Sequence, residues 1–201
     1  MNARDALDLG MADHFVPRDR REALLEALGE GDFGARTPRD LRAGVQAAID
    51  AMEERSPAPQ AQVWPHLDHI QKLVGQVDAP TAVKQILRDT RDDAWLAANR
   101  TRLEAGSPLS AHLVWLMLDR HRLTSLADAF RDELNLSVQC CRQGDIAEGV
   151  RALLIDKDKN PRWRHADVDS VPQADLDALM RPLWNSESHP LRDLGTGERV
   201  N

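Results

Sequence analysis

The chain has 201 residues, 42% of them hydrophobic and 29% charged, and its net charge is -7 at pH 7. This composition is ordinary for a globular protein with a sizeable core, and it argues against general nucleic-acid binding, which requires clustered Lys and Arg. No apolar run approaches the ~20 residues that span a bilayer, and no signal-peptide pattern opens the chain. We therefore expect a soluble, cytoplasmic protein with no nucleic-acid or membrane partner.

The N-terminal part predicts helices and one short strand. A first helix ends at Gly10, the strand covers residues 13–16 before Pro17, and a second helix covers residues 18–28. A Gly-rich link follows.

A cap and a proline mark the next helix. Thr37 followed by Pro38 is typical of a helix start, and the helical pattern continues to about Arg55. Residues 56–62 contain two prolines and form a linker.

From Val63 onward the chain predicts short helices that pack by one apolar face. Asp78, Ser107 and Thr124 are the expected caps, and a last helix covers residues 173–180 before a polar tail. The expected packing positions are Leu109, Leu113, Leu116 and Met117 in one helix, and Leu126, Phe130, Leu134, Val138 and Cys141 in the next.

Cysteine and histidine give no strong signal for a site. Cys140 and Cys141 are neighbours on a helix, so their side chains point about 100° apart, and we expect core or half-buried thiols in a reducing compartment. His66 and His69 lack the further ligands of a metal shell. We expect no metal, and contacts within the fold for His112 and His121.

Residues 145–163 are the most informative segment. Asp145 and Glu148 have the spacing of a capping box, which favours capping over a general-base role for Glu148. Arg151 is expected to pair with a carboxylate on a neighbouring helix. The expected packing stripe is Ile146, Val150, Leu153 and Leu154.

Three motifs resemble the crotonase (enoyl-CoA hydratase/isomerase) superfamily. The first is the Glu-Gly-x-x-Ala helix at residues 148–152, followed by the Asp-Lys-Asp-Lys run at 156–159 and by Pro161-Arg162-Trp163. The others are residues 3–17 and the Ser-Pro-x-Ser at 107–110. Together they look most similar to the 3-hydroxyisobutyryl-CoA hydrolase branch, over roughly residues 3–180.

The resemblance implies a C-terminal part of that fold. We expect a mainly α chain, the C-terminal helical portion of a crotonase-like α/β fold, with at most one short strand left from the core. The implied regions are residues 1–28 as the end of the core, 29–62 as a variable helical insert and linker, 63–184 as a C-terminal helical region and 185–201 as a flexible tail. An exposed apolar patch around Leu7, Leu9, Phe15 and Val16 is expected where the sheet belongs.

The oxyanion-hole donors and catalytic carboxylates of this family lie upstream of the matching segment. We therefore expect no catalytic residue in this chain, no cofactor, and a truncated protein, inactive alone, whose full-length form hydrolyses an acyl-CoA thioester in valine catabolism. A fragment of an enoyl-CoA hydratase or isomerase, and a non-enzymatic helical interaction protein, are the alternatives. A homo-oligomer stays open.

The charged run at 156–159 has two interpretations. It is a solvated helix end in which Lys157 interacts with the helix dipole. Alternatively, the resemblance implies that Lys157 binds the nucleotide end of CoA, with Arg162 and Trp163 as neighbours.

Overall fold

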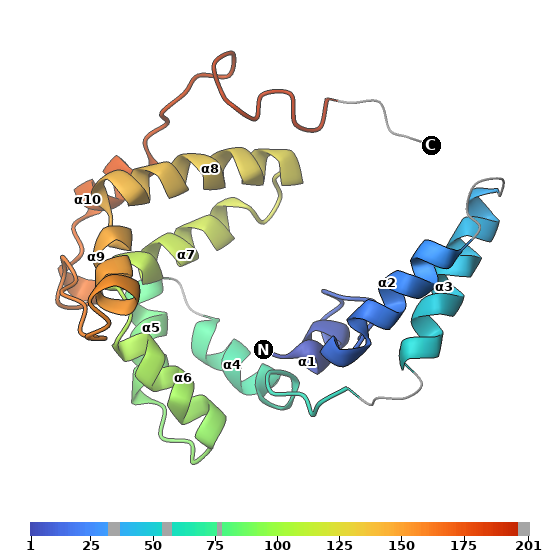
Figure 1. Cartoon of the computed structure of the whole chain (residues 1–201). Coiled ribbons are helices and arrows are strands. Elements are labelled where there is room, and N and C mark those ends of the chain that lie inside the picture. Colours follow the sequence, from blue (N-terminus) through green and yellow to red (C-terminus); the bar gives the residue numbers. More distant parts are fainter. Residues whose placement is uncertain (32–36, 54–57, 76–77, 197–201) are drawn as a thin grey trace. The chain divides into compact units, whose positions relative to one another are not determined.

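The computed structural model shows a helical protein. Among the described residues every regular element is a helix and no strand occurs, which confirms the predicted fold class. The chain forms two compact units, Met1–Gln71 and Lys72–Asn201, which are described separately (Figure 1). The predicted boundaries at 28, 62 and 184 stay predictions. The structure describes residues 1–31, 37–53, 58–75 and 78–196.

The strand predicted at residues 13–16 is absent, and that prediction was wrong. The segment has no regular structure. A β-strand requires a second strand to pair with, and no other strand occurs among the described residues. Leu7, Leu9, Phe15 and Val16 are half-buried, so the exposed apolar patch expected around them is not observed.

The first unit begins with a helix that ends as predicted, since Gly10 takes a left-handed conformation with φ of 68°. The Thr37 hydroxyl caps the third α-helix by accepting from the Asp40 N–H at 3.3 Å, and the helices on either side of residues 32–36 lie side by side (Figure 1). The elements are α1 (Ala3–Asp8), η1 (Arg18–Arg20), α2 (Arg21–Glu30), α3 (Pro38–Glu53), η2 (Trp64–His66) and the start of α4 (Leu67–Val74). The predicted end near Arg55 lies outside the described residues.

Asp5 organises this unit, and its side chain has no exposed surface. Its carboxylate accepts from the N–H groups of Asn2 at 2.8 Å and of Gln62 and Val63 at 2.7 Å each. Burial alone raises the pKa of the Asp5 carboxyl, but these backbone donors together with the Trp64 N–H hold it below its usual value. A charged group therefore joins α1 to the segment before α4.

The second unit consists of capped helices. The side chains of Asp78 and Ser107 accept the N–H groups of Thr81 and Ser110, as predicted. The cap expected at Thr124 is wrong, since Ser125 accepts from the Asp128 N–H at 3.1 Å while the Thr124 hydroxyl contacts His121. The elements are the end of α4, α5 (Ala79–Arg88), α6 (Ala94–Glu104), α7 (Pro108–Arg120), α8 (Leu126–Gln143), α9 (Ile146–Val150), the π-helical turn η3 (Arg151–Ile155), η4 (Val168–Ser170) and α10 (Gln173–Met180).

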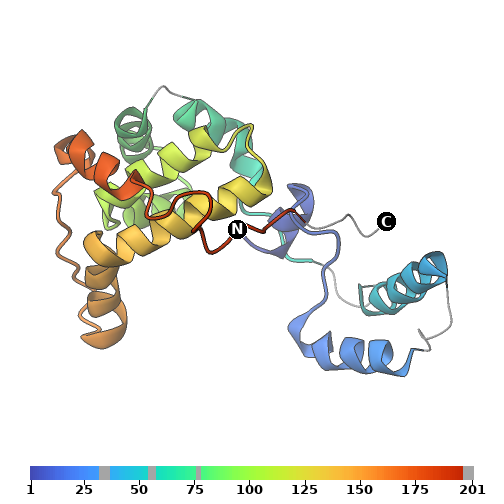
Figure 2. The ribbon, with the colours of Figure 1, turned by 90° about the horizontal axis from the view of Figure 1, so that it is seen from above.

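The core of the second unit lies where α10 meets α7 and α8 (Figure 2). Leu109 and Leu113 of α7 pack with Leu176 and Leu179 of α10. Helix α8 contributes Leu136 and Cys140.

The apolar stripe predicted for α8 does not face this core. Leu126 and Phe130 are 74% and 48% exposed, and Cys141 is exposed although a half-buried thiol was expected. Cys140 is half-buried, and burial raises the pKa of its thiol. The position of α10 determines which face of α8 is buried. The hydrophobic periodicity of α8 alone does not predict where α10 lies.

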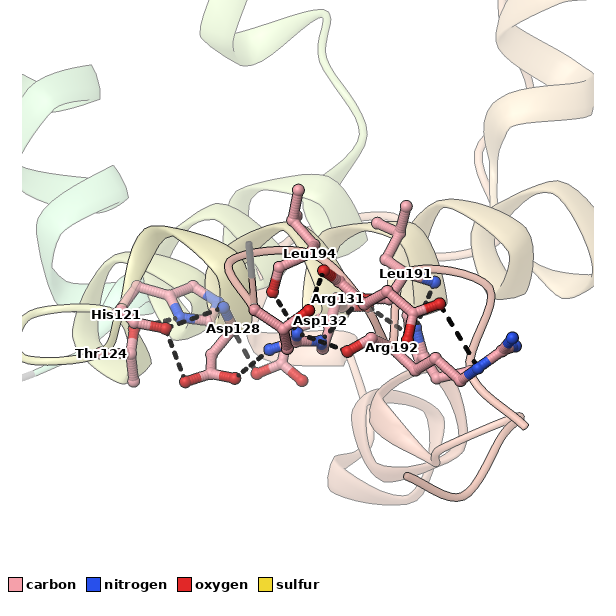
Figure 3. Close-up of polar contacts among 12 residues, drawn as sticks. His121, Thr124, Asp128, Arg131, Asp132, Leu191, Arg192 and Leu194 are labelled. Carbon is pink, nitrogen blue, oxygen red and sulfur yellow. Dashed lines mark hydrogen bonds and ion pairs between the residues drawn. The ribbon is translucent and has the colours of Figure 1, made fainter. Parts of the chain in front are cut away.

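The chain after α10 returns along α8, where Arg131 holds it (Figure 3). The Arg131 guanidinium donates to the carbonyl oxygens of Leu191 at 3.0 Å, Arg192 at 3.1 Å and Leu194 at 2.6 Å. His189 is buried beside Trp184. The flexible tail expected from residue 185 stays a prediction, although the hydrogen bonds from Arg131 hold the segment at residues 191, 192 and 194.

Candidate functional site

The segment with the most motif residues forms α9 and η3, and its start differs from the prediction. Asp145 stands at the N-cap position, but its side chain makes no capping hydrogen bond. Its backbone is not extended, with φ of -84° and ψ of 2°, whereas a capping side chain requires an extended residue. The carboxylate instead accepts from the Ser107 hydroxyl at 2.5 Å and the Arg164 N–H at 3.3 Å.

Glu148 is not part of a capping box either. Both of its carboxylate oxygens accept from Arg151, at 2.9 Å from Nε and 2.7 Å from Nη2. One oxygen also accepts the Arg162 N–H at 2.6 Å. Glu148 and Arg151 therefore form a bidentate ion pair, which is stronger than a single hydrogen bond between an arginine and a carboxylate.

Arg151 also holds the loop that follows. Its Nη1 donates to Asp156 at 2.6 Å and to Asp158 at 2.8 Å, and its Nη2 donates to the carbonyl of Asn160 at 3.2 Å. The expected partner on a neighbouring helix is therefore wrong, because the loop folds back over the same helix and brings its own carboxylates within reach.

These contacts shift the pKa values of Glu148, Asp158 and Arg151. The hydrogen bond from Arg151, followed by the Arg162 N–H, lowers the pKa of Glu148 to about 2. Arg151 and then the Asn160 N–H lower the pKa of Asp158. The carboxylates raise the pKa of Arg151 above its already high value. Glu148, Arg151 and Asp158 are therefore all held in their charged forms at neutral pH.

The two lysines of the loop have unusual backbones. Lys157 and Lys159 have φ of 56° and 53°, a left-handed conformation that disfavours residues with a Cβ. The Lys159 N–H donates to the Ala152 carbonyl at 3.0 Å, and the Asp156 N–H donates to the Arg151 carbonyl at 2.8 Å, which closes the turn. Both lysines are exposed.

The other two residues of the expected CoA contact follow the loop directly. Arg162 is exposed. Trp163 is half-buried, its Nε1–H donates to the Ala105 carbonyl at 2.9 Å, and a methyl group at Gly149 would stand 3.4 Å from its ring. Lys157 and Arg162 thus lie on one exposed loop, while Trp163 attaches that loop to the end of α6.

The sequence interpretation missed the central element, the Glu148–Arg151 pair. Its signal was present, because Glu and Arg three residues apart on a helix can pair and two aspartates follow five and seven residues after Arg151. The stripe Ile146, Val150, Leu153 and Leu154 was expected to pack, but these side chains are 44%, 39%, 61% and 62% exposed.

A second exposed apolar surface runs along α7. Val114 and Leu118 are 61% and 68% exposed. On one side they border a hollow of about 850 Å³ that α5 and α6 also line, and on the other a hollow of about 600 Å³ beside α8. This surface fits a binding face better than a closed core.

The histidines do not gather into a metal site. His112 Nε2 lies 2.8 Å from the Val168 carbonyl and His121 Nδ1 lies 2.9 Å from the Thr124 hydroxyl, so both make the expected contacts within the fold. His66 and His69 belong to η2 and α4. In the described ranges, no three His, Cys, Asp or Glu residues form a cluster that could hold a metal ion.

Comparison with protein families gives one match over most of the chain. A family model described as enoyl-CoA hydratase/isomerase matches residues 1–180.

In the part of the chain that the structure describes, no helix has the length and apolar character to cross a membrane.

Curated relatives match over almost the whole chain. The 3-hydroxyisobutyryl-CoA hydrolase, mitochondrial, of Gallus gallus is 28% identical over 190 residues, which is 93% of this chain and 47% of the relative. The human protein of the same name is 26% identical, with coverage of 93% and 47%. The 3-hydroxyisobutyryl-CoA hydrolase-like protein 5 of Arabidopsis thaliana is 26% identical, with coverage of 90% and 46%. The chain spans about half the length of these relatives.

Solved structures give the same picture. An enoyl-CoA hydratase from Rhodobacter sphaeroides has a TM-score of 0.68 at 26% identity, over 91% of this chain and 48% of its own. A carnitinyl-CoA dehydratase from Mycobacterium thermoresistibile has a TM-score of 0.70 at 24% identity, over 90% and 47%. The helical fold described above therefore corresponds to about half of each of these structures.

Proposed function

This chain belongs to the enoyl-CoA hydratase/isomerase family, and from that premise we propose that it forms the C-terminal part of an acyl-CoA thioester hydrolase that resembles 3-hydroxyisobutyryl-CoA hydrolase and acts in valine catabolism. The names of the curated relatives support the hydrolase branch. The observation that carries the proposal is the loop 156–160, which presents exposed lysines from a conformation that Arg151 fixes.

The loop suits the polyphosphate end of CoA. Lys157 and Arg162 are exposed cations on one segment, and a lysine ammonium acts on phosphate as a mobile point charge. The carboxylates of Glu148, Asp156 and Asp158 already pair with Arg151, which limits their repulsion of a phosphate. In this proposal Trp163 holds the loop in place through its bond to Ala105.

The chain alone is proposed to lack hydrolase activity. In the hydrolase mechanism that the resemblance implies, backbone N–H groups stabilise the thioester oxyanion and carboxylates direct the proton transfers. Those groups belong to the other half of the fold. The share of each relative that this chain covers, 47% for the Gallus gallus protein, supports this division.

The binding test is a titration of the chain with coenzyme A, followed by backbone amide NMR signals. We expect shifts concentrated at residues 156–163, and weaker shifts with dephospho-CoA, which lacks the 3′-phosphate. Arg142 lies outside this loop and provides a control signal. Unchanged signals at millimolar coenzyme A contradict the proposed contact.

The activity test follows release of the free CoA thiol from 3-hydroxyisobutyryl-CoA. We expect none above the buffer rate for the 201-residue chain. The intact mass of the protein in its native source decides which protein to assay next. A mass about twice that of this chain would direct the assay to the longer protein, and hydrolysis there is the expected result.

A hydratase or isomerase is the second candidate, and the likeness to the Rhodobacter sphaeroides structure favours it. The same protein assayed with crotonyl-CoA separates the two, because hydration removes the enoyl absorbance without releasing a thiol. A helical interaction protein is the third candidate, and the exposed side chains of Val114 and Leu118 favour it.

The compartment and the assembly are part of the same proposal. Several animal relatives are named as mitochondrial, so a mitochondrial location competes with the cytoplasmic one that we expected. Cell fractionation with an antibody against residues 145–163 distinguishes them.

We also propose a homo-oligomer, because Val114 and Leu118 form an exposed apolar face on α7.

A further inference from the structure

We propose that Arg151 is the positioning residue of the CoA-binding loop: its guanidinium fixes the backbone of residues 156–160. The inference rests on the proposed function, because it concerns the same loop. It gives Arg151 a role in ligand binding that the comparisons do not assign.

The first argument is the number of bonds that Arg151 makes. A guanidinium has five N–H donors in one plane, and Arg151 makes five hydrogen bonds, to Glu148 twice and to Asp156, Asp158 and Asn160 once each. Glu148 fixes the guanidinium on the helix, and the other three bonds reach the loop. Arg151 therefore connects the helix to both sides of Lys157 and Lys159.

The second argument is the backbone of the two lysines. Lys157 and Lys159 occupy left-handed positions that glycine takes at lower cost. Such a conformation persists only where the surroundings impose it. Here the Arg151 bonds, the Lys159 N–H to Ala152 carbonyl bond and the Asn160 N–H to Asp158 carboxylate bond impose it.

The third argument is charge. Glu148, Asp156 and Asp158 each accept a hydrogen bond from the Arg151 guanidinium. Loss of Arg151 therefore releases the loop and also leaves these three carboxylates without the cation that they share, which increases their repulsion of a phosphate.

The substitutions Arg151→Lys and Arg151→Met separate position from charge. Lysine keeps the positive charge but has three donors on a flexible stem and no planar fork. Positioning predicts that Arg151→Lys behaves like Arg151→Met, whereas a purely electrostatic role predicts that Arg151→Lys behaves like the wild type. The matched control is Arg142→Met, which removes an exposed arginine from α8.

The first readout needs no ligand. A lysine-specific protease cuts after Lys157 and Lys159 only when the loop opens, and the rate of this cut is measured by mass spectrometry on chains shown by circular dichroism to be folded. We expect both Arg151 variants to be cut roughly tenfold faster than the wild type, and Arg142→Met to be cut at the wild-type rate. Equal rates for all four chains overturn the positioning role.

The second readout is calorimetric titration with coenzyme A. We expect Lys157→Met and Arg151→Lys each to weaken binding severalfold, with a smaller effect on dephospho-CoA. If the wild-type chain does not bind coenzyme A, or if Lys157→Met leaves binding unchanged, the proposed function of the loop fails and this inference with it. If Lys157→Met weakens binding but Arg151→Lys does not, the proposed function stands and this inference is overturned.

Discussion

The Ser107 hydroxyl donates a 2.5 Å hydrogen bond to the Asp145 carboxylate, and this bond joins the start of α7 to the start of α9. The same hydroxyl accepts the Ser110 N–H at 3.1 Å and so caps α7. Ser107 therefore connects the Ser-Pro-x-Ser motif to the N-cap position of the helix that carries the Glu-Gly-x-x-Ala motif, 38 residues further along the chain.

Replacement of Ser107 by alanine tests this double role. We expect Ser107→Ala to lower the free energy of unfolding by about 1–3 kcal/mol, since it removes a cap and leaves a half-buried carboxylate without its hydroxyl donor. Ser125→Ala is the matched control, because the Ser125 hydroxyl also caps its helix and donates to a carboxylate, but that carboxylate belongs to Asp128 in the same turn. Equal losses in urea denaturation of the two variants would show that the link from Ser107 to Asp145 adds no more stability than a bond within one turn.

The Glu148 carboxyl predicts a loss of stability in acid. Its pKa is about 2 in the folded chain, below the ordinary value of 4.5. A carboxyl whose pKa is lower when folded stabilises the protein fully above its unfolded pKa, and this contribution disappears as the pH falls toward the folded value. We expect the stability difference between wild type and Glu148→Gln to be constant above about pH 5 and to shrink between pH 4.5 and 2. Denaturant midpoints at several pH values measure it, and a difference independent of pH contradicts it.

Substitutions that leave a cavity in the core of the second unit should lower the free energy of unfolding strongly. Leu109 and Leu179 are each 1% exposed and pack together. We expect Leu109→Ala or Leu179→Ala to lower the free energy of unfolding by about 2–5 kcal/mol. Leu123 is 98% exposed, so Leu123→Ala should change it by less than about 0.5 kcal/mol. Thermal and urea unfolding give both values.

Arg131 predicts the behaviour of the C-terminal segment. Its side chain bonds the carbonyl groups of Leu191, Arg192 and Leu194 (Figure 3). We expect Arg131→Met to increase amide hydrogen exchange at residues 185–196 while α7 and α10 keep their protection. Arg122→Met, at an exposed arginine beyond the end of α7, should leave that exchange unchanged. Rapid exchange of the segment in the wild type would instead support the flexible tail.

The exposed face of α7 predicts self-association. Leu118 is 68% exposed between two apolar hollows. We expect Leu118→Lys to reduce association in analytical ultracentrifugation and to reduce binding of a hydrophobic dye. Leu123→Lys places the same charge outside both hollows and serves as the control. A wild-type chain that is monomeric at all concentrations would refute the proposed homo-oligomer.

The sequence determined the family and most of the helices. The caps at Asp78 and Ser107, the helix start at Pro38 and the helix Gln173–Met180 were predicted from a few adjacent residues. Such predictions succeed because a cap or a proline acts within one turn, and its partners are the next three or four residues.

The tertiary structure decided which groups meet. The Asp145 carboxylate accepts from the Ser107 hydroxyl and makes no cap on its own helix, and the Asp5 carboxylate accepts from the N–H groups of residues 62 and 63. The packed face of α8 likewise depends on α10. These partners are distant in the sequence, so neither helical periodicity nor a capping pattern predicts them. The Glu148–Arg151 pair spans only three residues and was predictable from its spacing, whereas the return of the following loop to Arg151 was not.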